Sequence, residues 1–152
     1  MAGKVSPSVK KLTGKEYFGK TNTLNLGNVF LGIGLASSVP AVNSAEYFAG
    51  FVEPSGSDGY SREPVGDYSQ TALQYFDDGT TDANGDVTFK NTKEIKFDTY
   101  RGASAISVKY VVLFNASSGG NCLLYFELSS AITLNPGELL VIPVGQATLK
   151  IS

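Results

Sequence analysis

The sequence contains no histidine and no tryptophan, one cysteine, and one methionine, which is the first residue. Without histidine the chain lacks the commonest general base near neutral pH and cannot by itself form Ser–His or Cys–His nucleophile pairs. It also lacks the imidazole ligand that most catalytic zinc and iron sites use. These absences predict a protein that is not an enzyme and that holds neither a cofactor nor a metal ion.

A single cysteine cannot form an internal disulfide, and Cys122 occupies an apolar position of a predicted strand. We therefore expect a buried structural thiol rather than a reactive one. No apolar run approaches the roughly 18 residues of a membrane span. The first residues, MAGKVSPSVKKL, also lack the apolar stretch of a signal peptide. A soluble protein made in a cytoplasm, without a membrane partner, is expected.

Charge is scarce and unevenly distributed, although the net charge is only −2. Residues 1–26, the N-terminal arm, carry five lysines against Glu16, a net charge of +4, whereas residues 27–152 carry seven bases against 13 acids, a net charge of −6. The lysines of the arm are Lys4, Lys10, Lys11, Lys15 and Lys20. We interpret the arm as an anchor for an acidic surface, such as a neighbouring copy. The alternative is a solvated, frayed terminus.

The division at residue 26 gives two units, an arm over 1–26 and a β-domain over 27–152. We expect the arm to be extended or partly helical, with Ser8 as a candidate helix cap. Basic residues do not gather with aromatic residues on the body, so the sequence does not favour a nucleic-acid partner.

Alternating apolar residues predict strands along the body. In residues 28–35 the apolar side chains fall on one face, and Gly32 and Gly34 on the other leave room for another backbone or subunit to approach. The Asn84–Gly85 pair predicts a hairpin, and residues 135–138 suit a type II turn.

The C-terminal third predicts a long hairpin between residues 106 and 128. One face of its first strand would carry Ile106, Val108, Tyr110, Val112 and Phe114, and one face of its second strand Cys122, Leu124, Phe126 and Leu128. With about eight to ten short strands and no long helix, the pattern predicts an all-β fold: an antiparallel, jelly-roll-like β-sandwich preceded by the arm.

The loops offer two candidate binding chemistries. Asp77, Asp78, Asp82 and Asp86 are neighbouring acids that could bind Ca²⁺, but their spacing fits no EF-hand, so solvated turn carboxylates are the default interpretation. The aromatic and charged residues of the 43–76 region suit contacts between protein subunits, and sugar stacking is the alternative. The candidate contact residues are Gly32, Gly34, Tyr47, Phe48, Tyr60 and Arg62.

Five stretches of the chain carry a resemblance when they are taken in order. They are NVFLGIGLASSVP, VEPSGSDGYSREPV, DANGDVTFKNTKEIKFDTY, VKYVVLFNASSGGNCLLYFEL and LNPGELLVIPVGQATLKIS. Over residues 28–152 the chain resembles a family of small tailed-bacteriophage virion proteins of the tail fibre, head fibre or capsid decoration type. That family often has a tryptophan just before the strand at 106–114, where this chain has Tyr100, which leaves the register of residues 99–105 open.

The resemblance implies a β-sandwich body and a non-enzymatic, homo-oligomeric role, with a trimer favoured over a dimer. We expect a virion structural protein, made in the host cytoplasm, that decorates or stabilises the capsid or projects from the particle as a fibre. Its expected partners are other copies of itself and the major capsid protein or another virion protein, which the arm would anchor. The alternative is a receptor-binding module in which loops 53–63 and 115–121 recognise host-surface carbohydrate.

Overall fold

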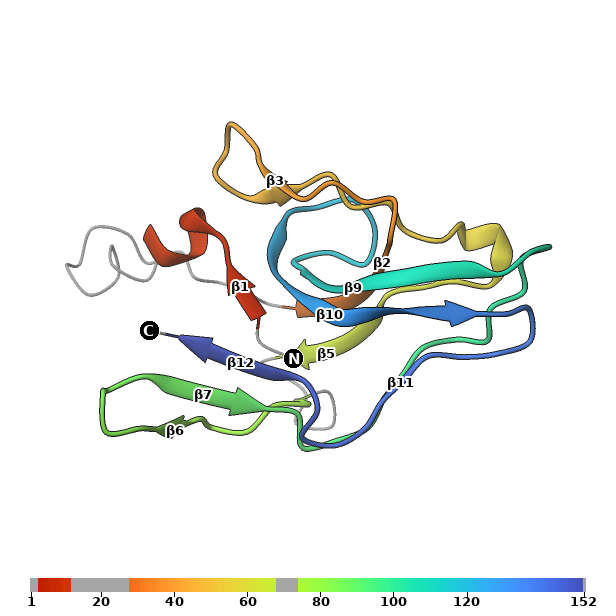
Figure 1. Cartoon of the computed structure of the whole chain (residues 1–152). Coiled ribbons are helices and arrows are strands. Elements are labelled where there is room, and N and C mark those ends of the chain that lie inside the picture. Colours follow the sequence, from red (N-terminus) through yellow and green to blue (C-terminus); the bar gives the residue numbers. More distant parts are fainter. Residues whose placement is uncertain (1–2, 12–27, 68–73, 152) are drawn as a thin grey trace.

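The structure is a computed structural model that describes residues 3–11, 28–67 and 74–151 (Figure 1). Strands dominate these residues, and every strand pair is antiparallel. The all-β class expected from the sequence is therefore confirmed.

The larger layer is a seven-stranded sheet in the order β3-β4-β10-β9-β2-β5, with β1 added alongside β10. Its strands are β1 (Gly3–Val5), β2 (Asn28–Leu35), β3 (Ala41–Val42), β4 (Phe48–Ala49), β5 (Glu63–Asp67), β9 (Ile106–Phe114) and β10 (Cys122–Leu134). A short 3-10 helix, η1 (Gly56–Asp58), precedes β5.

Two small sheets form the second layer. One contains β6 (Thr80–Thr81), β7 (Val87–Lys90) and β12 (Thr148–Ile151), and the other pairs β8 (Ile95–Lys96) with β11 (Val141–Ile142). Figure 1 shows the three-stranded sheet below the β9–β10 hairpin. The layers are thus unequal, and the jelly-roll detail of the expected sandwich stays a prediction.

The main core lies between the two layers. The large sheet contributes Leu31, Ile33, Val65, Val111 and Phe126, and the second layer contributes Ile95, Phe97, Leu140, Ile142 and Ala147. Tyr100 is also buried here, and its hydroxyl donates a hydrogen bond to the Ser104 carbonyl at 2.9 Å. The aromatic ring of Tyr100 therefore fills the core just before β9.

A second apolar cluster covers the opposite face of the large sheet. It contains Val112, Phe114, Cys122 and Tyr125, with Phe48, Phe51 and Tyr110 packed against it. Phe51 makes a T-shaped contact with Tyr110 at a centroid distance of 5.7 Å. Both faces of β9 are therefore buried along part of its length.

The predicted faces of the β9–β10 hairpin are wrong at two places, because each strand contains a bulge. In the β2–β9 ladder, Gly34 pairs with Tyr110 and the next residue, Leu35, pairs with Val108, so Lys109 is extra. Val108 consequently faces the main core, whereas Val112 faces the second cluster. The prediction places Cys122 and Leu124 on one face of β10. The register shifts between them, so Cys122 lies in the second cluster and Leu124 in the main core. A one-residue insertion exchanges the two faces of a strand.

The first described residues of the arm belong to the body's sheet. Strand β1 pairs with β10, and residues 7–11 are helical. The cap is Ser6, whose hydroxyl accepts from Val9 N, and not Ser8, whose hydroxyl donates to the Ala45 carbonyl at 2.6 Å. Pro7 fits the first helical position because it needs no N–H donor there. The expected division at residue 26 stays a prediction.

Both predicted turns are present. Gly85 has φ 84° and lies in the tight connection from β6 to β7, where Thr81 pairs with Val87. Gly137 has φ 89°, and Glu138 N donates to the Asn135 carbonyl at 3.0 Å. These are the left-handed positions for which the sequence supplies glycine.

Candidate functional site

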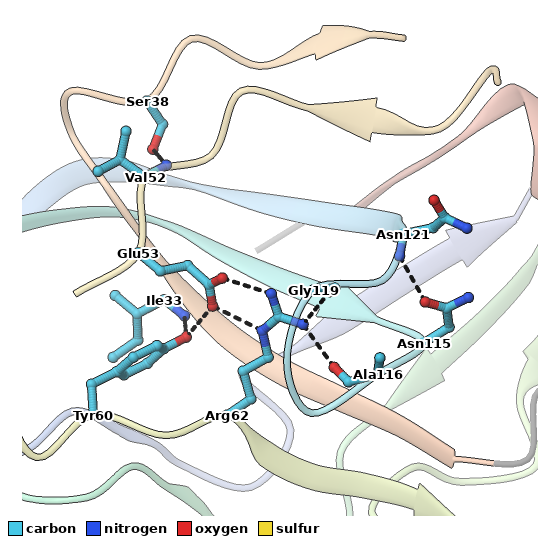
Figure 2. Close-up of polar contacts among 10 residues, drawn as sticks. All are labelled: Ile33, Ser38, Val52, Glu53, Tyr60, Arg62, Asn115, Ala116, Gly119 and Asn121. Atoms are coloured by element: carbon cyan, nitrogen blue, oxygen red, sulfur yellow. Dashed lines mark hydrogen bonds and ion pairs between the residues drawn. The ribbon is translucent and has the colours of Figure 1, made fainter. Parts of the chain in front are cut away.

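Arg62 is the centre of a buried polar cluster on the outer face of the large sheet (Figure 2). Its guanidinium forms a two-pronged ion pair with Glu53, with Nε 2.9 Å from Oε1 and Nη2 2.6 Å from Oε2. Nη1 donates to the carbonyls of Ala116 and Gly119 at 2.7 and 2.8 Å. Only 6% of the Arg62 side chain is exposed, and its Cζ lies 3.4 Å from the centroid of the Phe114 ring.

Tyr60 completes this cluster. Its hydroxyl donates to Glu53 Oε1 at 2.5 Å and accepts from Ile33 N at 2.9 Å. Burial, followed by the hydrogen bond to Glu53, raises the pKa of the Tyr60 phenol well above its usual range. The phenol is therefore a fixed structural donor, and it ties the 53–62 segment to β2.

Gly32 and Gly34 make room for this arrangement. A Cβ at Gly32 would lie 2.7 Å from Tyr60 Oη and 2.8 Å from Glu53 Oε1, and one at Gly34 would lie 2.9 Å from Tyr110 Cβ. The close approach expected at these glycines is thus made by side chains of the same chain. Contact of the two glycines with another copy stays a prediction.

The cluster joins loops 53–63 and 115–121, which the alternative prediction makes a carbohydrate-recognition site. Arg62 links residues 53–62 to loop 115–121, and that loop is closed by Asn121 N, which donates to Asn115 Oδ1 at 2.7 Å (Figure 2). Beside them is a hollow of about 220 Å³, with Asn43, Phe48, Phe51, Asn121 and Gly120 in its wall. Its wall combines amide and aromatic side chains with Arg62 and Glu53, which are paired with each other.

The other predicted contact residues are placed as follows. Phe48 packs edge-on against Tyr125 at a centroid distance of 4.9 Å. Tyr47 closes the β3–β4 hairpin, where its N–H donates to Asn43 Oδ1 at 3.1 Å. The structure therefore brings Gly32, Tyr60 and Arg62 together and places Tyr47 at a separate turn.

Two of the three described lysines of the arm lie near acids of the body. Lys4 Nζ lies 4.0 Å from Glu127 Oε2, and Lys11 forms an exposed ion pair with Glu46. Lys10 is exposed. Lys15 and Lys20 lie outside the described residues, and the anchoring role of all five lysines stays a prediction.

Cys122 and the loop acids have structural roles. Cys122 is 3% exposed, and burial raises the pKa of its thiol to about 12, which confirms the expected buried thiol. Asp77 Oδ1 accepts from Gly79 N and Lys90 N, and Asp82 Oδ1 accepts from Asn84 N and Asp86 N. Across the part of the chain that the structure describes, no group of three potential ligands could hold a metal ion. The same residues include no helix that is long and apolar enough to cross a membrane.

Exposed apolar residues are the feature that sequence reasoning missed. Among the described residues the large exposed ones are Val39 (76%), Val144 (58%), Val42 (51%), Val52 (45%) and Ile132 (41%). Alternation identifies the strands but does not show which strand lies at a sheet edge. One signal in the sequence could have pointed to the exposed valines at 39 and 42: residues 36–45, ASSVPAVNSA, contain no charge.

Comparison with known proteins gives one family. The family model described as Podophage GP4 fiber I protein gp80 matches residues 15–150. No curated protein matches the chain.

Proposed function

This chain belongs to the family of Podophage GP4 fiber I protein gp80, and from that membership we propose that it is the subunit of a fibre that projects from the phage particle. Membership makes it a phage fibre protein, and hence a structural component of the virion. The observation that carries the proposal is the match itself, which covers residues 15–150 and so the whole β-domain except its last two residues. Decoration of the capsid surface is the competing location.

The distribution of polar groups supports a role in contact rather than catalysis. Arg62, Glu53 and Tyr60 are saturated by one another and by backbone groups, so they hold loops in place. A rigid scaffold with exposed valines suits association between copies where those valines gather into a patch, because contiguous apolar patches mark contact surfaces. We favour a homo-oligomer, and a trimer over a dimer on the family resemblance alone.

Attachment to the particle is assigned to the Lys-rich arm. Lys10 is exposed beside the ion pair of Lys11, and the arm as a whole is basic. The proposed binding partner of the arm is the major capsid protein or another virion protein with an acidic surface.

Imaging of particles tests the location. Gold-labelled antibody against the full chain should mark projections from wild-type virions, and virions that lack the gene should lose those projections while their shells stay intact. Label spread evenly over the shell lattice would instead establish decoration and overturn the fibre proposal. Light scattering of the purified full chain tests self-association, for which a species larger than one chain is expected.

Recognition of host-surface carbohydrate is the second candidate, because the 220 Å³ hollow presents amides beside the Phe51 ring. A glycan array would report binding that Asn121→Ala abolishes and Asn84→Ala, on a distant turn, preserves. Tyr60→Ala is a poor probe, since Tyr60 holds Glu53 and β2 in place. An array without reproducible binding would remove this candidate.

A further inference from the structure

The exposed apolar residues form two separate surfaces. Val39, Val42 and Val52 define the first, which we call the edge surface. Val42 belongs to β3, which is the last strand on its side of the large sheet, and Val39 and Val52 flank the hairpin, with Val39 N bonded to the Gly50 carbonyl and Val52 N to Ser38 Oγ. Figure 1 shows this hairpin projecting from the top of the molecule.

The edge surface carries no charge, unlike the opposite edge of the same sheet. Natural proteins protect an open edge with charges, with proline or with a very short edge strand. The opposite edge, β5, has both Glu63 and Pro64. The β3 edge is a two-residue strand preceded by Pro40, and residues 36–45 contain no charge. Without a charge, the exposed valines beside this edge are open to apolar contact with another chain.

The second surface is a groove of about 340 Å³ between β10 and β11. Its apolar wall consists of Val111, Leu128, Ile132, Leu140, Val141 and Ile142. Pro143 and Gln146 complete the wall, so no charged side chain lines it. Exposed Val144 directly follows Pro143 in the chain. We call the groove together with Val144 the groove surface.

Strand edges border the groove on both sides. Within the described residues, β10 pairs with β1 only at Gly3–Val5, opposite residues 124–126, so residues 132–134 pair on one side, with β9. Strand β11 likewise pairs on one side, with β8. An extended segment can therefore add backbone hydrogen bonds to its side-chain contacts in this groove, as in strand addition.

We propose that the edge surface of one copy docks into the groove surface of a second copy, head to tail. This inference rests on the proposed function, because it specifies how copies of the fibre subunit associate. Every large exposed apolar residue of the described part belongs to one of these two surfaces, and both are uncharged. One surface projects and the other is hollowed, and Figure 1 places the β3 hairpin and β11 on different sides of the molecule.

The arrangement has a consequence for symmetry. A contact between two different surfaces is heterologous, and it either closes into a ring or continues as a filament. A two-fold dimer would instead join a surface to the same surface of the other copy. A trimer is one ring that such a contact can close.

Single charges test both surfaces. Val42→Lys and Val144→Lys should each convert the oligomer seen by light scattering into a monomer, because each buries an unpaired charge in the contact. Ser118→Lys, an exposed position outside both surfaces, should leave the oligomer intact. Circular dichroism of all three variants should match the parent. An oligomer that survives both valine substitutions would overturn the proposal.

Engineered cysteines distinguish the proposed contact from other forms of self-association. Val42→Cys and Val144→Cys, prepared separately and then mixed and oxidised, should form a disulfide-linked pair that neither variant forms alone. The parent, which has only buried Cys122, is the control for background. Cross-linking of Val42→Cys with itself would show a two-fold contact and overturn the head-to-tail proposal while self-association stood. A parent that stays monomeric, with no cross-link in the mixture, would overturn both.

Discussion

The ion pair of Arg62 with Glu53 gives the sharpest prediction about stability. Arg62→Met removes the cation but keeps most of the apolar length of the side chain, so the change isolates the charge and its hydrogen bonds. Glu53 would be left as a carboxylate that is only 23% exposed, and the carbonyls of Ala116 and Gly119 would lose their shared donor.

Removing one partner of a buried ion pair costs about 3–5 kcal/mol, because the other charge is left without compensation. Glu53 keeps the Tyr60 hydroxyl and some contact with water, so we expect a loss near the lower end, about 3 kcal/mol. That loss lowers the melting temperature by roughly 10 °C for a chain of this size. Arg62→Lys keeps the charge but not the two-pronged geometry or the carbonyl bonds. We expect it to lie between the parent and Arg62→Met.

Urea denaturation at one fixed protein concentration measures this loss, since self-association makes stability depend on concentration. The control is Lys11→Met, which breaks an ion pair whose side chains are 60% and 43% exposed. It should change the free energy of unfolding by less than about 1 kcal/mol. If Arg62→Met changed stability no more than Lys11→Met, the cluster would not hold loop 115–121 as we argue.

Three further predictions concern other sites. Burial and the nearby Asp98 carboxylate raise the pKa of Glu63, so its ionised form opposes folding and stability falls as pH rises through that pKa. Glu63→Gln should therefore raise the free energy of unfolding, measured with urea, by roughly some tenths of a kcal/mol at pH 7 but not at pH 3, whereas exposed Glu94→Gln should show no such gain. Gly34→Ala should destabilise by about 1–3 kcal/mol because its Cβ meets Tyr110, while Gly56→Ala, with open space around it, should stay within about 1 kcal/mol of the parent; calorimetry compares the two. Cys122 should resist a thiol reagent at pH 8 until urea unfolds the chain, and rapid labelling of the native protein would contradict its burial.

The strands were predictable because alternation of apolar and polar residues depends only on the two-residue repeat of a strand. Residues 28–35 and 106–114 therefore lie in strands, and the turn residues at 84–85 and 135–138 mark where the chain reverses. Which cluster each side chain of β9 faces could not be predicted beyond Lys109, because the position of a bulge depends on how the strand pairs with its neighbours. Counting by two from Ile106 crosses the bulge and assigns Val112 to the wrong cluster.

The candidate site was predictable only in part. Tyr60 and Arg62 stood out as polar and aromatic residues beside glycine-rich turns, and both are central to the cluster. Glu53 was not singled out, because a single acid in a loop gives no sign of its partner. The pairing needs β2, the 53–62 segment and loop 115–121 in one place, and residues so far apart in the sequence meet only through the fold. The glycines of the strand at residues 28–35 also gave no hint that Gly32 accommodates Tyr60 rather than another subunit.

Lys109 lies in the bulge of β9, and its Nζ donates to the carbonyl of Leu128 at 2.6 Å in the bulged part of β10. Ile106 and Val108, before it, face the main core, and the residues after it contribute to both clusters, so one strand is shared by the two halves of the interior. Deleting Lys109 would exchange inward and outward side chains over the rest of β9 and disrupt both halves together. For engineering, foreign peptides are therefore best inserted at the exposed tip around Asn84, which is remote from this shared strand.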